Sequence, residues 1–278
     1  MSLSAATFPQ IRLGPHLVSR LILGVNTING GSHLSRFLNA HMKRYFTPEQ
    51  VDSLLAHCQE EGINTWQAGV DNLPALHRFR AAGGQMQFIS VAHPGEGEDV
   101  IERLAEAGTL GIAHHGEVTD VLFNRGELDG IESFLRRIRD AGMQVGVSTH
   151  MPEVVDYVES KSWDVDYYMT CVYERHRTRE ELQALLGHVP LPIHEVYLED
   201  DPPRMFAAMR QTAKPCLAFK ILAAGRLCEK QETVEQAFKD TLAQIKSNDA
   251  LIVGIYPEFE DQVALDAEYV RRYSALSG

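Results

Sequence analysis

The chain has 278 residues, 44% of them hydrophobic, and a formal net charge of −12. This length suits one large domain or two small ones. The acidic balance argues against a nucleic-acid-binding protein, because that class presents a basic face. No run of about 18 apolar residues occurs, so no membrane span is expected, and the opening MSLSAATFPQ does not have the charged and then apolar pattern of a signal peptide.

The four cysteines, Cys58, Cys171, Cys216 and Cys228, are far apart and form no CxxC pair. The spacing predicts neither a disulfide framework nor a structural zinc site, and each cysteine is expected to be a small buried hydrophobe. We therefore expect a cytoplasmic protein.

Short apolar runs alternate with amphipathic helical stretches along the whole chain. Thr47, Thr178 and Thr233 have the spacing of helix N-caps, and the stretch 129–141 places Ile131 and its apolar neighbours on one face. Eight such units predict an α/β fold, a single (β/α)₈ TIM barrel over residues 1–278. A doubly wound sheet fits less well because no GxGxxG follows the first strand. The expected strands are 20–25, 63–68, 87–92, 109–114, 144–149, 165–170, 216–221 and 250–255.

Two connections, 27–46 and 173–214, are longer than a barrel needs. In a (β/α)₈ barrel both include loops at the C-terminal rim, where active sites lie. We keep two interpretations open: a lid over the site, or a homo-oligomer contact or solvated surface.

Alternation along the strands predicts which side chains face the barrel interior. The pattern sends Gly111, Ala113 and His115 inward from the fourth strand, and Gly146, Ser148 and His150 inward from the fifth. In the seventh strand, Leu217 and Phe219 are expected to face outward and Lys220 inward. The resulting polar ring at the strand ends is Asn26, Gln67, His115, His150, Thr170, Lys220 and Tyr256, with His93 and His114 close by.

Lys220 lies among apolar residues in CLAFKILAAG, so burial should lower its pKa and suit it to act as a base, an oxyanion stabiliser or a Schiff-base nucleophile. The alternative is a structural lysine paired with a carboxylate such as Asp166. We predict Lys220, His150 and His115 as catalytic residues. Asn26, Gln67, Thr170 and Tyr256 are predicted to bind substrate.

A divalent metal between His93, His115 and His150 is a further hypothesis, because histidines at neighbouring strand ends build such sites in barrels. Against it, no carboxylate is clearly placed at a strand end, and no HxH or HExxH spacing occurs.

Several segments resemble, in order, those of the aldo/keto reductase superfamily. VSRLILGVNTINGG resembles its first strand and glycine turn, EEGINTWQAGVD its second, and DAGMQVGVSTHMPEVVDYV its fifth. AFKILAAGRL and NDALIVGIYPEFEDQV resemble the seventh and eighth. The resemblance implies a (β/α)₈ barrel, of the kind also found in bacterial proteins of this group without an assigned reaction.

The resemblance also implies a redox site of aspartate, tyrosine, lysine and histidine, and most of it does not carry over. Gln67 stands at the aspartate position, Asn72 near the tyrosine and His93 near the lysine, and only the histidine has a match, at His114 or His115. Carboxylates follow the eighth strand where the family binds the 2′-phosphate of NADPH, so NADP is not expected, although NAD remains open.

Three functions follow from these observations. The first is a non-redox lyase, isomerase or hydrolase that acts on a small oxygenated, sugar-like or carbonyl substrate by histidine and lysine acid–base chemistry. The second is an NAD(P)-dependent oxidoreductase with a rearranged site. The third is a catalytically inactive barrel with a binding role, which Lys220→Ala would separate from the first.

Overall fold

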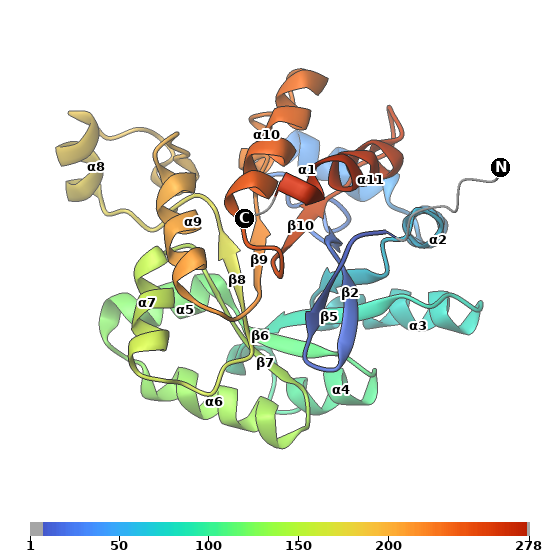
Figure 1. The fold of residues 1–278 in the computed structure, drawn as a ribbon, viewed down its shortest axis with the longest axis horizontal. Coiled ribbons are helices and arrows are strands. Elements are labelled where there is room, and N and C mark those ends of the chain that lie inside the picture. The colour runs from blue at the N-terminus through green and yellow to red at the C-terminus, as the bar shows by residue number, and fades with distance from the viewer. Residues whose placement is uncertain (1–7, 277–278) are drawn as a thin grey trace.

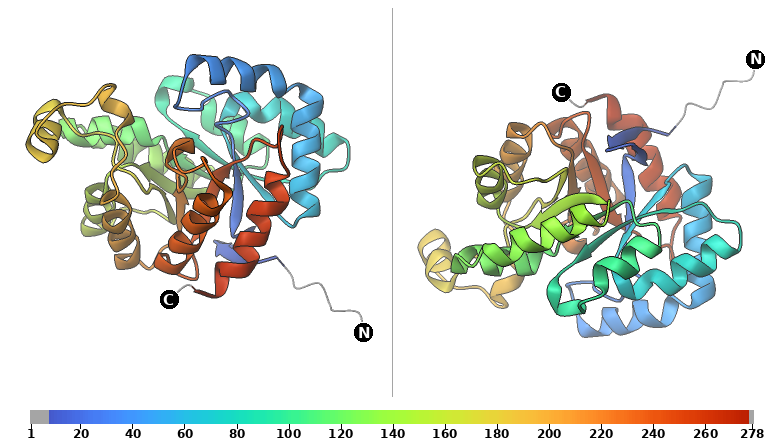
Figure 2. Two further views of the ribbon diagram at one scale, coloured as in Figure 1. Left: turned by 90° about the horizontal axis from the view of Figure 1, so that it is seen from above. Right: turned by 90° about the horizontal axis from the view of Figure 1, so that it is seen from below.

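The computed structural model describes residues 8–276, so the first seven residues of the opening segment discussed above lie outside the described part. Eight parallel strands close into one barrel in the order β10-β3-β4-β5-β6-β7-β8-β9 (Figures 1 and 2). The predicted TIM barrel is confirmed. The barrel strands are β3 (Leu21–Gly24), β4 (Thr65–Ala68), β5 (Gln87–Ala92), β6 (Gly111–His114), β7 (Gln144–Thr149), β8 (Tyr167–Cys171), β9 (Cys216–Phe219) and β10 (Ala250–Gly254).

Helices surround the strands as an outer layer (Figures 1 and 2). Within the described residues, no helix is long and apolar enough to cross a membrane. The α-helices are α1 (Arg36–Tyr45), α2 (Pro48–Glu60), α3 (Leu73–Ala81), α4 (Val100–Glu106), α5 (Gly116–Arg125), α6 (Asp129–Asp140), α7 (Pro152–Ser160), α8 (Arg179–Leu186), α9 (Asp201–Gln211), α10 (Gln231–Gln244) and α11 (Gln262–Tyr273).

Short 3₁₀ helices occur in the connections and after α11. They are η1 (Val70–Asn72), η2 (Pro94–Glu96), η3 (Ile193–Glu195), η4 (Ala223–Gly225) and η5 (Ser274–Leu276).

An antiparallel hairpin that the sequence analysis did not predict precedes the barrel: β1 (Gln10–Leu13) and β2 (His16–Ser19). Its apolar residues Ile11, Leu13 and Val18 belong to the same buried cluster as the interior residues of the barrel. The hairpin therefore closes the end of the barrel at which the strands begin, and the other end is left for the cavity described below.

Two of the three predicted N-caps are confirmed. The side chains of Thr47 and Thr178 accept hydrogen bonds from the backbone N–H groups of Gln50 and Glu181. The prediction for Thr233 is wrong: α10 begins at Gln231, and the Thr233 hydroxyl donates instead to the carbonyls of Leu227 and Lys230.

The predicted facing is correct for β6 and β7 and wrong for β8 and β9. In β6 and β7, Ala113 lies in the interior cluster, and the missing side chain of Gly146 leaves room for the ring of Tyr167. In β8 and β9 the large residues Tyr167, Met169 and Leu217 fill the interior, and Tyr168 and Ala218 face the helices. The ring of Tyr167 faces inward because Gly146 on the adjacent strand and Gly111 on the next one leave space for it.

The two long connections contain helices of their own. Residues 27–46 include α1, and residues 173–214 include α8, η3 and α9. Figure 1 shows α8 standing away from the barrel, whereas the chain before and after it returns to the rim.

Candidate active site

A cavity of about 830 Å³ opens at the end of the barrel where the strands finish. Loops after β3, β6, β7, β9 and β10 line it, together with Arg175 from the connection 173–214. Its volume is in the range of pockets that bury a small organic ligand. Of the predicted site residues, it is lined by Asn26, Gln67, His115, His150, Lys220 and Tyr256.

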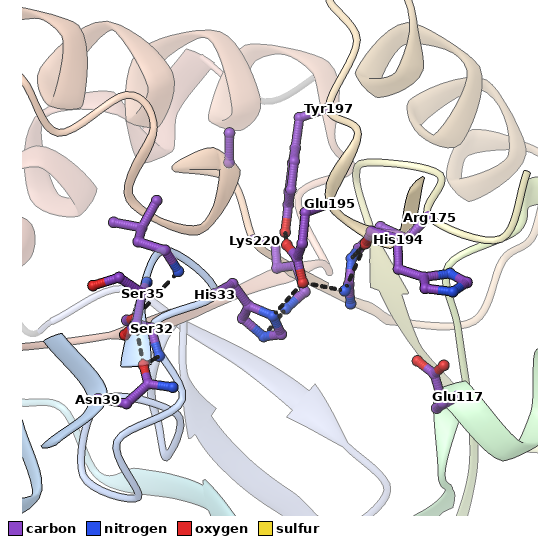
Figure 3. A network of polar contacts seen from close by, with 12 residues as sticks. Ser32, His33, Ser35, Asn39, Glu117, Arg175, His194, Glu195, Tyr197 and Lys220 are labelled. Carbon is purple, nitrogen blue, oxygen red and sulfur yellow. Dashed lines mark hydrogen bonds and ion pairs between the residues drawn. The ribbon is translucent and has the colours of Figure 1, made fainter. Parts of the chain in front are cut away.

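Lys220 is the first of three side chains joined end to end (Figure 3), and the first two, Lys220 and His33, line this cavity. Its Nζ lies 2.9 Å from Nε2 of His33, and His33 Nδ1 lies 3.0 Å from Oε1 of Glu195. Because Glu195 is an acceptor, Nδ1 of His33 carries the proton and Nε2 accepts from the amine of Lys220. Lys220 does not pair with Asp166, the carboxylate named for the structural alternative, since Asp166 binds Arg139 and the backbone N–H of Val145.

Glu195 is held in place by two further donors. Arg175 donates to Oε1 at 2.8 Å, and the hydroxyl of Tyr197 donates to Oε2 at 3.1 Å. Arg175 also binds the carbonyl of His194, at 2.9 Å from one guanidinium nitrogen. The carboxylate therefore has a fixed position from which to orient His33.

The backbone conformation brings the lysine and the histidine together. Lys220 and His33 both have left-handed backbones, with φ of 60° and 57°. Lys220 follows Phe219, which faces inward, so an extended chain would turn the lysine toward the helices. The left-handed turn redirects it into the cavity, at a cost of about 1–2 kcal/mol.

Burial lowers the pKa of the Lys220 amine, and the charge of Arg175 lowers it further against opposing effects of Cys171 and Glu195. Burial also lowers the pKa of His33, as does the nearby charge of Lys220. Both shifts increase the fraction of neutral amine beside neutral imidazole. A neutral lysine amine is a nucleophile, and a protonated one is not.

His150 follows β7 and is held by Asp120 of α5. The buried carboxylate of Asp120 lies 2.8 Å from Nδ1 of His150 and accepts from its backbone N–H at 2.9 Å. The hydroxyl of Thr149 donates to its other oxygen. These contacts fix the plane of the His150 ring, whose edge meets Phe219 with ring centroids 5.5 Å apart.

Gly116 allows α5 to come this close to β7. A Cβ at this position would lie 2.9 Å from the hydroxyl of Ser148 and 3.3 Å from Cε1 of His150. A glycine at the first residue of α5 therefore lets Glu117 and Asp120 approach His150.

His176, from the connection 173–214, also lies at this place. Its Nε2 is 3.3 Å from Oδ2 of Asp120 and 3.5 Å from Oε2 of Glu117. The rings of His150 and His176 have centroids 5.3 Å apart.

The remaining predicted histidines take different positions. His114 is fully buried behind the site, where Nδ1 lies 2.8 Å from the Thr119 hydroxyl and the ring packs edge-on against Phe134. His115 caps α5 and lines the cavity, with its ring 5.8 Å from that of His93. Nδ1 of His93 accepts from the N–H of Gly95.

The structure does not assemble His93, His115 and His150 as a metal site. Among residues 8–276, the one group of histidine, cysteine or acidic side chains with suitable spacing joins His150 to Glu117 and His176 instead.

Three of the four predicted substrate-binding residues line the cavity, and one does not. Gln67 and Asn26 reach the cavity from β4 and from the loop after β3. Tyr256 lines it with its hydroxyl donated to Glu258. Thr170 is a correction: it pairs with Thr149 and Ala218 on the outward side of β8, is fully buried, and does not line the cavity.

Sequence reasoning missed five residues of the site. His33 lies just after Gly30, Gly31 and Ser32, in a loop that the sequence predicts at the rim. Glu117 and Asp120 follow the predicted end of the fourth strand. The positions of these three residues were therefore available from the sequence. No sequence signal identifies the partners that the connection 173–214 supplies. The five residues are His33, Glu117, Asp120, His176 and Glu195.

No protein-family model matches the chain, and no curated protein matches its sequence. Solved structures do match its fold. A truncated 3-deoxy-D-arabino-heptulosonate 7-phosphate synthase from Thermotoga maritima aligns with a TM-score of 0.56 at 13% identity, covering 98% of this chain and 93% of that one.

Two further solved structures match the fold. The glycerol dehydrogenase of Gluconobacter oxydans aligns with a TM-score of 0.56 at 13% identity, over 98% of this chain and 95% of its own. An aldo/keto reductase from Brucella melitensis aligns with a TM-score of 0.51 at 11% identity, over 98% and 100%. The barrel expected from the resemblance to aldo/keto reductases is therefore confirmed, and at these identities the likeness shows the fold alone.

Proposed function

We propose that the protein is a lyase or isomerase of a small carbonyl compound, and that Lys220 is its nucleophile. The observation that carries this proposal is the chain Lys220–His33–Glu195, with contacts of 2.9 and 3.0 Å, whose first two members line the cavity. A nucleophile, a base within hydrogen-bond reach of it, and a third group that orients the base form the arrangement of covalent catalysis.

The chemistry that this arrangement supports is imine formation. The neutral amine of Lys220 adds to the carbonyl carbon, and His33 transfers one of the two nitrogen protons to the alkoxide oxygen, which gives a carbinolamine. His33 then transfers the second nitrogen proton to this hydroxyl group, which leaves as water while the C=N bond forms. The net change is one carbonyl group and one amine converted to one imine and one water.

The imine, once protonated, draws electrons from the adjacent carbon. It thereby assists either proton removal or cleavage of a carbon–carbon bond at that position, which are the steps of an isomerase and of a lyase. We assign His150 and His115 to the neighbouring wall of the cavity, where His115 acts on the substrate oxygen and His150 faces it. Gln67 and Asn26 are proposed to hold substrate hydroxyls.

Reductive trapping tests the proposal. Untagged protein is incubated with dihydroxyacetone, glyceraldehyde or pyruvate and sodium cyanoborohydride, and peptides are mapped by mass spectrometry. We expect at least one probe to be attached at Lys220, and the label at that site to be lost in Lys220→Ala. Lys161→Ala removes an exposed lysine and should leave the Lys220 label unchanged. Labelling spread over surface lysines, with none enriched at Lys220, would count against an activated amine.

The oxidoreductase alternative makes a different prediction. It requires NADH or NADPH to bind in the same cavity, which titration of the cofactor fluorescence measures directly. The loop after β10 is acidic, and Glu258 there is engaged by His41 at 2.7 Å and by Tyr256. No basic group of that loop is available to meet a 2′-phosphate, so we do not propose NADP as a cofactor.

A further inference from the structure

We propose that Glu117, His150 and His176 bind one divalent transition-metal ion in the cavity wall. The three residues come from the first turn of α5, the end of β7 and the connection 173–214. One donor atom from each lies within 4.8 Å of the other two. The inference stands independently of the role of Lys220 and, if both hold, adds an electrophile to the proposed reaction.

The spacing is close to that of a bound ion. Metal–ligand bonds of about 2.0–2.1 Å in a tetrahedral zinc site place two donor atoms about 3.4 Å apart. His176 Nε2 and Glu117 Oε2 are 3.5 Å apart. The widest pair of donor atoms is at most 4.8 Å apart. To bind one ion, these two atoms have to approach each other by at most about 1.4 Å, and a side-chain rotation provides this movement.

His176 gives a second, independent indication. Its Nε2 is buried and has no hydrogen-bond partner within the described part of the chain, although it lies 3.3 and 3.5 Å from two carboxylates. Its contacts with these carboxylates are electrostatic only, and a buried polar atom that lacks a hydrogen bond is destabilising. A cation coordinated by this nitrogen would satisfy it and would balance the charges of Glu117 and Asp120.

Asp120 supplies the support that metal-binding histidines usually have. Such imidazoles commonly hydrogen bond to a carboxylate through the ring nitrogen that does not bind the metal. Asp120 binds Nδ1 of His150 at 2.8 Å, which fixes the tautomer and leaves Nε2 as the nitrogen able to coordinate. Asp120 is itself fixed by the Thr149 hydroxyl and the His150 backbone N–H.

Two histidines and one glutamate leave at least one coordination position open. This donor set is one that catalytic zinc sites use, and it also accepts other first-row divalent ions. Glu117 and His150 line the same cavity as Lys220, so an ion held by them faces the substrate. Its chemistry there would be to polarise an oxygen of the carbonyl compound.

Metal titration of untagged, chelator-treated protein tests the inference. Zn²⁺ binding is measured by calorimetry, and Co²⁺ binding by its visible absorption, which reports the geometry of coordination. We expect one ion per chain, with affinity reduced at least tenfold in His176→Ala and in Glu117→Gln. His188→Ala removes an exposed histidine of the same connection and should bind as the unchanged protein does.

The inference is overturned if the unchanged protein takes up no ion in stoichiometric amount, or if both variants retain full affinity. Glu117→Gln keeps the shape of the side chain, and circular dichroism checks that each variant is folded. Trapping at Lys220 is carried out on metal-free protein. A failure of metal binding therefore leaves the Lys220 result intact, and a failure of trapping leaves the metal result intact.

Discussion

Lys220 and His33 show how much of the site depends on single backbone conformations. Both are non-glycine residues with left-handed φ, and they meet at 2.9 Å. Ala223 and Ala224, just after the lysine, are left-handed as well. Such conformations persist only where the surrounding structure determines them, and they concentrate at functional sites. Here the left-handed conformation directs the Lys220 amine into the cavity, whereas strand alternation alone would have turned it toward the helices.

His114 is predicted to make the stability of the fold depend on pH. Burial, together with the nearby His93 and His115, lowers the pKa of His114 to about 4. A histidine in an unfolded chain titrates near 6.5. Between about pH 6.5 and pH 4, the unfolded chain therefore binds a proton at His114 that the folded chain does not bind. The contribution of neutral, buried His114 to the free energy of unfolding is fully present above about pH 6.5 and is lost as the pH falls toward 4.

Between pH 7 and pH 5, the expected loss from His114 is about 2 kcal/mol of unfolding free energy. Urea unfolding at pH 7 and pH 5 measures it. His114→Phe keeps the edge-on contact with Phe134 and does not titrate, and Thr119 still donates to the carbonyl of His115. The difference in unfolding free energy between pH 7 and pH 5 should be smaller in this variant. An unchanged difference would mean that other groups cause it.

At the scale of elements, the approach of α5 to β7 positions Asp120 against His150. Gly116→Ala should move α5 outward, because the new methyl group would meet the Ser148 hydroxyl at 2.9 Å. We expect a loss of about 1–3 kcal/mol in unfolding free energy and, if the metal inference holds, weaker Zn²⁺ binding.

Gly130→Ala is the matched control for Gly116→Ala. Gly130 lies in α6 and a Cβ there would meet nothing within 4 Å. This variant should be unchanged or up to about 1 kcal/mol more stable. Equal effects of the two substitutions would show that the contact with Ser148 does not limit the position of α5.

The elements of the barrel could be predicted from the sequence, but the facing of two strands could not. All eight strand positions follow from apolar runs, and in β6 and β7 the small residues Ala113 and Gly146 identify the inward side correctly. The same rule failed in β8 and β9, where Tyr167 and Leu217 fill the interior. Which face receives the larger residue depends on the space left by neighbouring strands, as Gly146 and Gly111 do for Tyr167, and this is a tertiary property.

Lys220 was predicted to enter the cavity for a reason that the structure corrects. The inward pattern assigned to its strand was reversed, and the left-handed φ of the lysine itself restores the predicted position. Glu195, which binds His33, lies 25 residues before Lys220 in a connection whose path over the rim has no local signature. The sequence therefore predicts Lys220 as a reactive residue, but it does not predict the hydrogen-bonded chain through His33 to Glu195.

At the scale of the whole molecule, the hairpin and the rim loops give the two ends of the barrel different roles. The hairpin β1–β2 packs Leu13 against the interior cluster, at the end where the strands begin. The cavity occupies the other end, which is where barrel enzymes place their sites.

Leu13→Ala is predicted to destabilise the entire barrel by about 2–5 kcal/mol, since Leu13 is fully buried and its removal leaves a void. Leu17→Ala in the same hairpin should cost less than about 0.5 kcal/mol, because Leu17 is 48% exposed. Urea unfolding followed by circular dichroism compares the two. A small effect of Leu13→Ala would show that the barrel is stable without this contact.

The titration of Lys220 tests the central claim most directly, because it requires no knowledge of the substrate. Trace acetylation between pH 6 and pH 11, quantified for each lysine by mass spectrometry, gives the midpoint at which each amine becomes reactive. Burial and the charge of Arg175 predict that Lys220 titrates below exposed Lys161 in the same sample. A lower midpoint for Lys220 supports an amine prepared for attack on a carbonyl group, and a midpoint equal to or above that of Lys161 would contradict it.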